Sequence, residues 1–351
     1  MRRASGIFDT SYIQDMTIFR TKYYSAGMVL LILFFLILPF FVRDFWLAFI
    51  SSTAVTVIAL QGLNILSGYC GQISIGHTAF MAVGAYSSTI LAAQFGVPLV
   101  LCLPFGGLGA AFIGLLFGLP SLRVKGYYLA LTTIAAQYLI IYVIKTPFPE
   151  VTGGAIALNV PALKIGNFEF QTERHFYYFV LVMLALMTFF AKSLMRGHVG
   201  RAFVAIRDND IASEAMGINL YQYKLLAFFI GCFYAGIAGA LWAAYSRVIS
   251  PDDFTLMGSI WYIGMLIIGG VGGTLGPFSG ALFIGALREI CVIVGPYISS
   301  MIPQIGAQIS ASLVEMTFGI TIILFLVFEP RGISHRWEIM KESYRLWPFS
   351  Y

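Results

Sequence analysis

Long apolar runs follow one another along nearly the whole chain, with short polar segments between them. Each run approaches the roughly 20 mostly apolar residues that a membrane-crossing helix needs. The runs do not alternate apolar and polar residues with a period of two, as barrel strands would. The pattern predicts an all-α polytopic membrane protein of about ten transmembrane helices. Their expected positions are 27–42, 45–66, 75–94, 97–119, 126–145, 175–191, 223–248, 256–272, 274–296 and 308–328.

The polar segments divide the chain into three parts. Residues 1–26 form an N-terminal segment, 27–328 a transmembrane domain and 329–351 a C-terminal tail. Positively charged loops favour the cytoplasm. One side receives only Arg43, Lys145, Lys164, Arg174 and Arg247, whereas most of the 21 lysines and arginines fall on the side of both termini. Both termini are therefore expected to be cytoplasmic.

Two of the loops are long. Loop 146–174 is rich in proline and glycine turns and is expected to form a short external cap. Loop 192–222 is expected in the cytoplasm, with the charge pattern of a structured surface element. The run 256–272 ends in GGVGG, so a full span and a re-entrant segment both stay open.

Composition narrows the function classes. The chain is 59% hydrophobic and 11% charged, less than half the charged share of about 25% in soluble domains. The net charge of +5 follows from the charged loops, so no nucleic-acid partner is expected. Cys70, Cys102, Cys232 and Cys291 lie far apart in the sequence. Their spacing predicts neither a disulfide framework nor a metal site.

The chain lacks the motifs of an enzyme or a motor. It contains no GxxxxGK[ST] phosphate loop, no HExxH and no GxSxG. Clustered carboxylates of the kind that form ion or proton relays are also missing, which argues against an ion-coupled transporter. Arg288 and Glu315 fall at similar depths in neighbouring predicted helices, which suggests an ion pair. The remaining interpretation is a translocation pore that is passive or powered by another protein.

The stretch GQISIGHTAF, residues 71–80, places polar side chains in this apolar context. Gly68 and Gly71 permit a tight turn after the second predicted helix. Ser74 is a good N-cap for the next helix. His77 and Thr78 would then point into the helix bundle near its cytoplasmic face. Small residues at four-residue spacing elsewhere, such as Gly231, Ala235 and Gly239, predict close helix packing.

Residues 62–91, GLNILSGYCGQISIGHTAFMAVGAYSSTIL, resemble the signature region of the LivM-type permeases, which are membrane subunits of bacterial ATP-binding cassette (ABC) importers for branched-chain amino acids. The resemblance continues in LRVKGYYLALTTIA (122–135), TGG (152–154), GRAFVAIRDNDIASEAMGINLYQYKLLAFFIGCFYAGIAGALWA (200–243) and IIGGVGGTLGPFSGA (267–281). It covers roughly residues 45–330. The two long blocks are highly specific.

The resemblance implies a coupling helix that contacts an ATPase. The family pattern EAAxxxG is similar to IASEAMG at 211–217, with matches at Ala212 and Gly217, Ser213 for the second alanine and Ile211 for the leading glutamate. The residues expected to mediate ATPase coupling are Arg201, Arg207, Asp208, Ala212, Ser213, Glu214, Ala215 and Gly217. The residues expected along the substrate pathway are Asn64, Gln72, Ser74, His77, Thr78, Thr152, Gly153 and Gly154.

The resemblance also implies partners. These are a second permease of related sequence, two cytoplasmic ATPase subunits and an external substrate-binding protein, in a bacterial inner (plasma) membrane with its lipid. The chain itself needs no cofactor, and ATP-Mg belongs to the ATPase subunits. The implied cargo is branched-chain or other apolar amino acids. A permease for urea or short amides and an ion-coupled secondary transporter are the alternatives.

Overall fold

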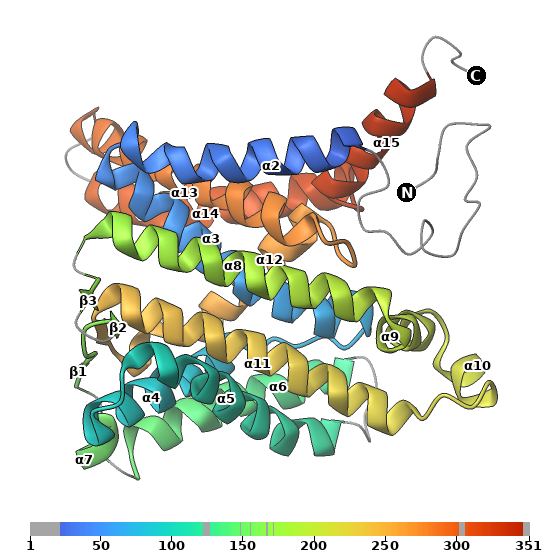
Figure 1. Cartoon of the computed structure of the whole chain (residues 1–351), viewed down its shortest axis with the longest axis horizontal. Coiled ribbons are helices and arrows are strands. Elements are labelled where there is room, and N and C mark those ends of the chain that lie inside the picture. Colours follow the sequence, from blue (N-terminus) through green and yellow to red (C-terminus); the bar gives the residue numbers. More distant parts are fainter. Residues whose placement is uncertain are drawn as a thin grey trace.

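The computed structural model describes residues 22–121, 127–147, 149–154, 156–165, 168–170, 172–301 and 306–346. Most of the predicted segment 1–26 therefore lies outside the described residues. The long helices are α2 (Lys22–Ile37), α3 (Asp44–Leu63), α4 (His77–Phe95), α5 (Leu99–Ser121), α6 (Tyr127–Lys145), α8 (Glu173–Arg196), α11 (Leu220–Ser246), α12 (Leu256–Gly269), α13 (Gly276–Met301) and α14 (Gly306–Phe328). They lie side by side along the long axis of the molecule (Figure 1).

Shorter elements connect these helices. They are η1 (Leu38–Phe40), the π-helix η2 (Asn64–Tyr69), α7 (Pro149–Thr152), α9 (His198–Asp208), α10 (Asp210–Ala215), η3 (Pro251–Asp253) and α15 (Ile333–Leu346), with strands β1 (Leu158–Asn159), β2 (Lys164–Ile165), β3 (Phe168–Glu169) and β4 (Val248–Ile249). The strands form two small antiparallel sheets, β1 with β4 and β2 with β3. The fold is therefore almost entirely helical.

A helix occupies each of the ten ranges that the sequence predicts as spans. Six helices of the described chain are long and apolar enough to cross a membrane: Asp44–Tyr69, Leu99–Leu119, Tyr128–Lys145, Glu173–Arg196, Leu220–Ser246 and Gly276–Tyr297. A seventh candidate joins Ser312–Phe328 to Ile333–Ser343 across a 44° bend. Helix α12 has only 14 residues, which is about 21 Å at 1.5 Å per residue. The chain is thus a multi-pass membrane protein.

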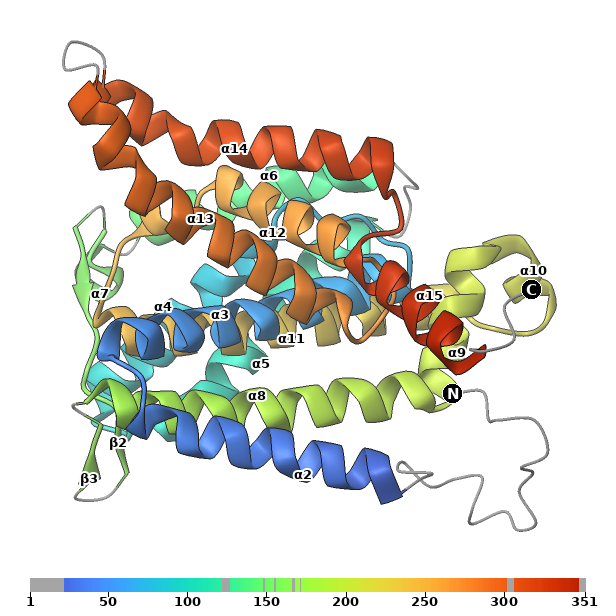
Figure 2. The ribbon, with the colours of Figure 1, turned by 90° about the horizontal axis from the view of Figure 1, so that it is seen from above.

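The two ends of the bundle differ. One end carries α7 and the four strands, and we call it the cap end; the other carries α9, α10 and α15, and we call it the coupling end (Figure 1). Seen from above, α2 and α14 form opposite flanks of the molecule (Figure 2). The chain leaves β4 at the cap end, and α12 then runs toward the coupling end.

Helix α11 forms the centre of the packing. A Cβ atom on Gly239 would overlap the Met81 carbonyl of α4, and one on Gly236 would lie 2.7 Å from the Gly106 carbonyl of α5. A Cβ atom on Gly62 of α3 would likewise lie 2.6 Å from the Gly231 carbonyl. These helices approach at backbone distance, so the prediction that small residues mediate packing is confirmed.

Candidate functional site

The chain between α3 and α4 re-enters the bundle without helical structure. After η2 ends at Tyr69, residues 70–76 are irregular and α4 begins at His77. The prediction that Ser74 caps this helix is wrong. The N-cap residue is Gly76, so no side chain caps the helix from that position. The Ser74 hydroxyl is fully buried and has no hydrogen-bond partner among the described residues.

Side chains from other helices satisfy the first amide groups of α4. The Thr78 amide donates to the Ser259 hydroxyl of α12 at 3.0 Å, and the Ala79 amide donates to Gln137 Oε1 of α6 at 2.9 Å. The start of an isolated helix leaves such amides without partners. Here the acceptors at the start of α4 come from other helices, so the position of α4 depends on α6 and α12.

The same side chains form a closed hydrogen-bond cluster. Thr78 Oγ1 donates to the Thr255 carbonyl at 2.8 Å and lies 2.8 Å from Ser259 Oγ. Gln137 Nε2 donates to the Phe254 carbonyl at 2.7 Å. We call Thr78, Gln137, Thr255 and Ser259 the polar junction. The side chains of Thr78, Gln137 and Ser259 are at most 4% exposed.

The polar junction lies in the middle of the bundle. Gln137 is roughly 12 Å from the Lys145 end of its apolar helix at about 1.5 Å per residue. The neighbouring His77 is 1% exposed, and its Nε2 donates to the carbonyl of Ala59, inside the span Asp44–Tyr69, at 2.9 Å. The prediction that His77 and Thr78 lie near the cytoplasmic face is therefore wrong, because residues 70–76 carry them inward.

Two helix N-termini meet at this point. Helix α12 begins beside Thr78, where Thr255 Oγ1 accepts from the Gly258 amide at 3.1 Å. Helix α4 runs from there toward the cap end and α12 toward the coupling end. Helix N-termini carry partial positive charge, and the acceptors in the polar junction are all neutral. The arrangement can orient a polar or anionic group, but it contains no acid or base for catalysis.

The other predicted pathway residues lie elsewhere. Asn64 Oδ1 accepts from the Gly272 amide and its Nδ2 donates to the Gly273 carbonyl, both at 2.9 Å. Asn64 thus fixes residues 270–275, which we call the glycine loop, at the coupling end. Gln72 is buried beside Cys70, where its Nε2 lies 3.5 Å from Sγ. Neither side chain joins the polar junction.

The TGG segment lies at the cap end. Thr152 Oγ1 donates to the Ile144 carbonyl at 2.8 Å, which closes the turn after α6. Gly153 and Gly154 have φ angles of +76° and +61°, which only glycine adopts readily. The predicted pathway residues thus fall at the cap end, the middle and the coupling end of the bundle.

The predicted coupling segment forms a short exposed helix. Asn209 caps α10 by accepting from the Ala212 amide at 3.0 Å. Gly217 follows it with φ +87°, the left-handed conformation that glycine commonly adopts after a helix C-terminus. The predicted side chains Arg201, Arg207, Asp208, Ala212, Glu214 and Ala215 are exposed, as is Gly217.

Ser213 differs from the other predicted coupling residues. Its side chain is 5% exposed and donates to the Asn209 carbonyl at 2.8 Å. It therefore faces its own chain and offers no free surface to a partner. Ile211 and Met216, which are absent from the predicted coupling set, have side chains that are 74% and 84% exposed. In the sequence, the signal that could have identified them is the presence of large apolar residues in an otherwise polar loop.

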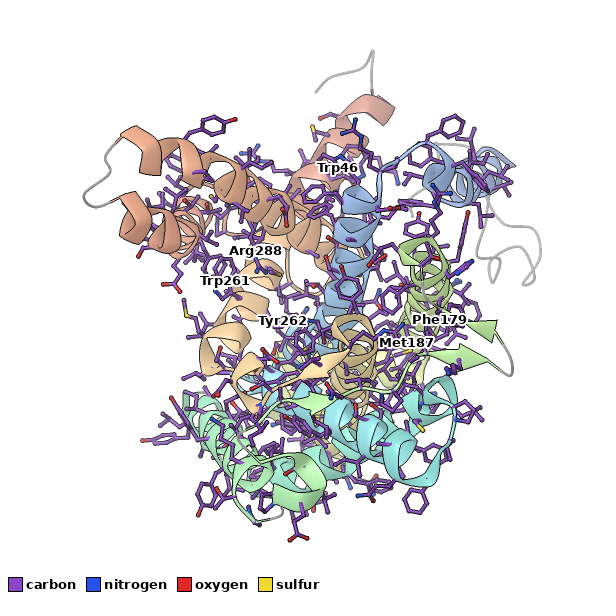
Figure 3. The ribbon with its side chains drawn as sticks, turned by 90° about the vertical axis from the view of Figure 1, so that its left-hand side faces the viewer. Trp46, Phe179, Met187, Trp261, Tyr262 and Arg288 are labelled. Atoms are coloured by element: carbon purple, nitrogen blue, oxygen red, sulfur yellow. The ribbon has the colours of Figure 1, made fainter. Side chains whose placement is uncertain are left out.

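The expected Arg288–Glu315 ion pair is not formed; the ion pairs of the described residues involve other side chains. Figure 3, viewed from the cap end, shows Arg288 beside Trp261 and Tyr262. Within the described residues, no three His, Cys, Asp or Glu side chains gather in a way that could hold a metal ion.

The chain belongs to the family of permease components of branched-chain amino acid transport systems, whose sequence profile matches residues 45–326. It is 30% identical to the high-affinity branched-chain amino acid transport system permease protein LivM of Escherichia coli K12, over 72% of this chain and 65% of that protein. The chain thus matches slightly less than two thirds of that relative's length.

Two further relatives extend the comparison. The probable LivM of Methanocaldococcus jannaschii is 25% identical over 67% of this chain and 68% of its own length. The nucleoside ABC transporter permease protein NupC of Lactococcus lactis is 24% identical over 81% of this chain and 92% of its own length. No solved structure matches the chain significantly.

Proposed function

We propose that this protein is the permease subunit of an ABC importer that carries branched-chain or other apolar amino acids across a bacterial inner membrane. The observation that carries the proposal is the exposure of two apolar side chains at α10, the short capped helix between α9 and α11. Ile211 lies in this helix and Met216 is its C-cap residue. Exposed apolar side chains on a small rigid helix are suited to burial against a partner protein. Family membership supports an ATPase subunit as that partner.

The proposed orientation places the coupling end in the cytoplasm. Lys192 and Arg196 lie in the last turns of α8, and Arg201 lies in α9, which is at this end together with α15 (Figure 1). The positive-inside rule favours the cytoplasm for that side. The cap end would then face an external substrate-binding protein. The proposal includes ten spans, with the shorter helices α2, α4 and α12 crossing as parts of the bundle.

The proposed pathway passes the polar junction. The hydroxyls of Thr78 and Ser259 and the two converging helix N-termini offer neutral polar groups in mid-membrane. A zwitterionic amino acid carries its own compensating charges, so it needs orientation rather than a charged relay. The Gly153–Gly154 turn would lie at the external mouth, and Asn64 and Gln72 toward the cytoplasmic exit.

The chain has no ATPase motif of its own, so energy would come from two cytoplasmic ATPase subunits that bind ATP-Mg. A second permease of related sequence would complete the pathway. Relatives named LivM and LivH both match this chain, which supports a heteromeric pair. No catalytic residue is proposed in this subunit.

Uptake competition tests the substrate class. Cells that express the chain with its genomic partners should take up labelled leucine, and unlabelled isoleucine and valine should compete. Competition by urea or acetamide alone would favour the amide alternative. Competition by nucleosides alone would favour the function named for NupC. Uptake without any ATPase that co-purifies with the chain would favour an ion-coupled transporter.

A further inference from the structure

Arg207, in the last turn of α9, reaches away from the exposed surface of α10. Its Nη1 donates to the Gly68 carbonyl of η2 at 3.0 Å. Its Nε and Nη2 donate to Asp208 Oδ1 at 3.0 and 2.9 Å. The Asp208 carboxylate thus fixes the plane of the guanidinium. Only 36% of the Arg207 side chain is exposed, although the residue lies on a surface helix.

Two glycines make room for this arginine. A Cβ atom on Gly71 would lie 2.9 Å from Arg207 Cγ, and one on Gly272 would lie 2.9 Å from Arg207 Nη1. Both glycines have positive φ angles, +73° and +81°. The guanidinium therefore lies between the irregular segment 70–76 and the glycine loop. These are the two segments that lead to the N-terminus of α4 and away from the C-terminus of α12.

The glycine loop connects this contact to the middle of the bundle. Asn64 holds the loop through Gly272 and Gly273, and a Cβ atom on Gly270 would meet Ser334 of α15 on its other side. Helix α12 ends at Gly269, next to the loop, and its first turn contains Ser259 of the polar junction. A rigid 14-residue helix thus lies between Arg207 and the polar junction.

We propose that Arg207 is a positioning residue that transmits movement of α10 to the glycine loop and through α12 to the polar junction. The inference rests on the proposed function, because it needs an ATPase that moves α10. Asn209 alone separates α9 from α10, so displacement of α10 pulls directly on the end of α9. The planar guanidinium makes several hydrogen bonds at once, so it transmits such a displacement better than a single flexible contact would.

The test measures uptake and ATP hydrolysis in the same proteoliposomes, with the full complex and its binding protein. Arg207→Ala should co-purify with the ATPase and hydrolyse ATP, while uptake per ATP hydrolysed falls roughly fivefold or more. Arg207→Lys keeps the positive charge but not the planar guanidinium, and its uptake per ATP hydrolysed should lie between those of the wild type and Arg207→Ala. Lys192→Ala, an exposed cation at the end of α8, should leave the ratio unchanged.

Gly272→Ala provides a second variant: its methyl group would lie 2.9 Å from Nη1 and alanine is strained at φ +81°, so it should separate the glycine loop from the guanidinium and lower the ratio as well. If Arg207→Ala does not assemble, Arg207→Lys and Gly272→Ala decide the question. A wild-type ratio in the assembled variants, or uptake and hydrolysis that fall in proportion, would overturn the inference and leave Arg207 as a structural contact. A wild-type complex without ATP-dependent uptake would remove the proposed function itself, and the inference with it.

Discussion

The hydroxyl oxygens of Thr78 and Ser259 lie 2.8 Å apart, although 181 positions separate the two residues in the sequence. The contact joins the first turn of α4 to the first turn of α12 in the middle of the bundle. Backbone groups that leave a helix at membrane depth need partners from the protein, because lipid offers none. The polar junction supplies these partners, so two interrupted helices can meet there.

Gln137 is the side chain on which the polar junction depends most. Gln137→Leu keeps the approximate volume but leaves the buried Phe254 carbonyl without its 2.7 Å donor, and the Ala79 amide keeps only the Gly76 carbonyl at 3.2 Å. A buried polar group without a partner costs about 1–3 kcal/mol. We therefore expect a lower melting temperature of the purified protein and reduced uptake. Gln222→Leu makes the same change at an exposed position and should have little effect. Equal melting temperatures for the two variants would contradict the role of Gln137.

The packing of α11 gives a second prediction. Gly239→Ala places a methyl group against the backbone of Met81, and we expect a loss of about 1–3 kcal/mol in stability. Gly319→Ala is the matched control, because nothing lies within 4 Å of its added Cβ. Alanine favours helix over glycine by roughly 0.5–1 kcal/mol, so this control should be neutral or stabilising. Thermal unfolding in detergent measures both, and a more stable Gly239→Ala variant would contradict the packing described.

The sequence predicts the helices well but not the meeting of α4 with α12. Apolar runs determine where helices form, and small residues at four-residue spacing indicate the close contacts of Gly231 and Gly239. Ser74 fits the local capping pattern, yet the acceptors that replace it come from Gln137 and Ser259, 58 and 181 positions away from their donors. Local sequence carries no record of such distant partners, so the inward course of 70–76 could not be predicted.

The coupling segment shows the same limit at a smaller scale. Family resemblance and charge asymmetry located the segment in the sequence. The inward direction of Ser213 depends on its bond to the Asn209 carbonyl. The inward course of Arg207 depends on Gly68, which is 139 positions away. The Ser213 bond is local, four residues apart, whereas the Arg207 contact follows from tertiary packing, which a single sequence does not display.

The exposed apolar side chain of Met216 gives a third prediction. Met216→Asp should leave folding unchanged, because the side chain is 84% exposed. It should weaken ATPase binding by more than about 1 kcal/mol if Met216 is an interface anchor. Quantitative co-purification measures the effect. Ile156→Asp, at a cap-end side chain that is 77% exposed, is the control, and equal ATPase recovery from both variants would argue against α10 as the docking helix.

The backbone at Gly217 provides a separate variant of the same segment. No neighbouring atom would obstruct a side chain there, but φ is +87°. A side chain in the left-handed region costs roughly 1–2 kcal/mol. Gly217→Leu should therefore distort the end of α10 and lower coupled transport while membrane insertion stays normal. Ala162→Leu on the cap-end loop should matter much less. Wild-type uptake by Gly217→Leu would show that the end of α10 does not need this conformation.

Labelling of single cysteines tests the orientation. The four native cysteines are buried and are replaced in the background protein to remove residual reaction. Ile156→Cys at the cap end should react with an impermeant maleimide in intact cells. Met216→Cys at the coupling end should react only after the membrane is opened. The reverse pattern would invert the proposed topology.

ATP-driven accumulation in proteoliposomes tests the central claim most directly. The purified complex is reconstituted with ATP inside, the binding protein and labelled leucine outside, and ionophores that collapse every ion gradient. We predict that leucine accumulates against its gradient and that accumulation stops when ATP is replaced by a non-hydrolysable analogue. Accumulation that needs an ion gradient and ignores ATP would contradict the assignment of this chain as an ABC permease.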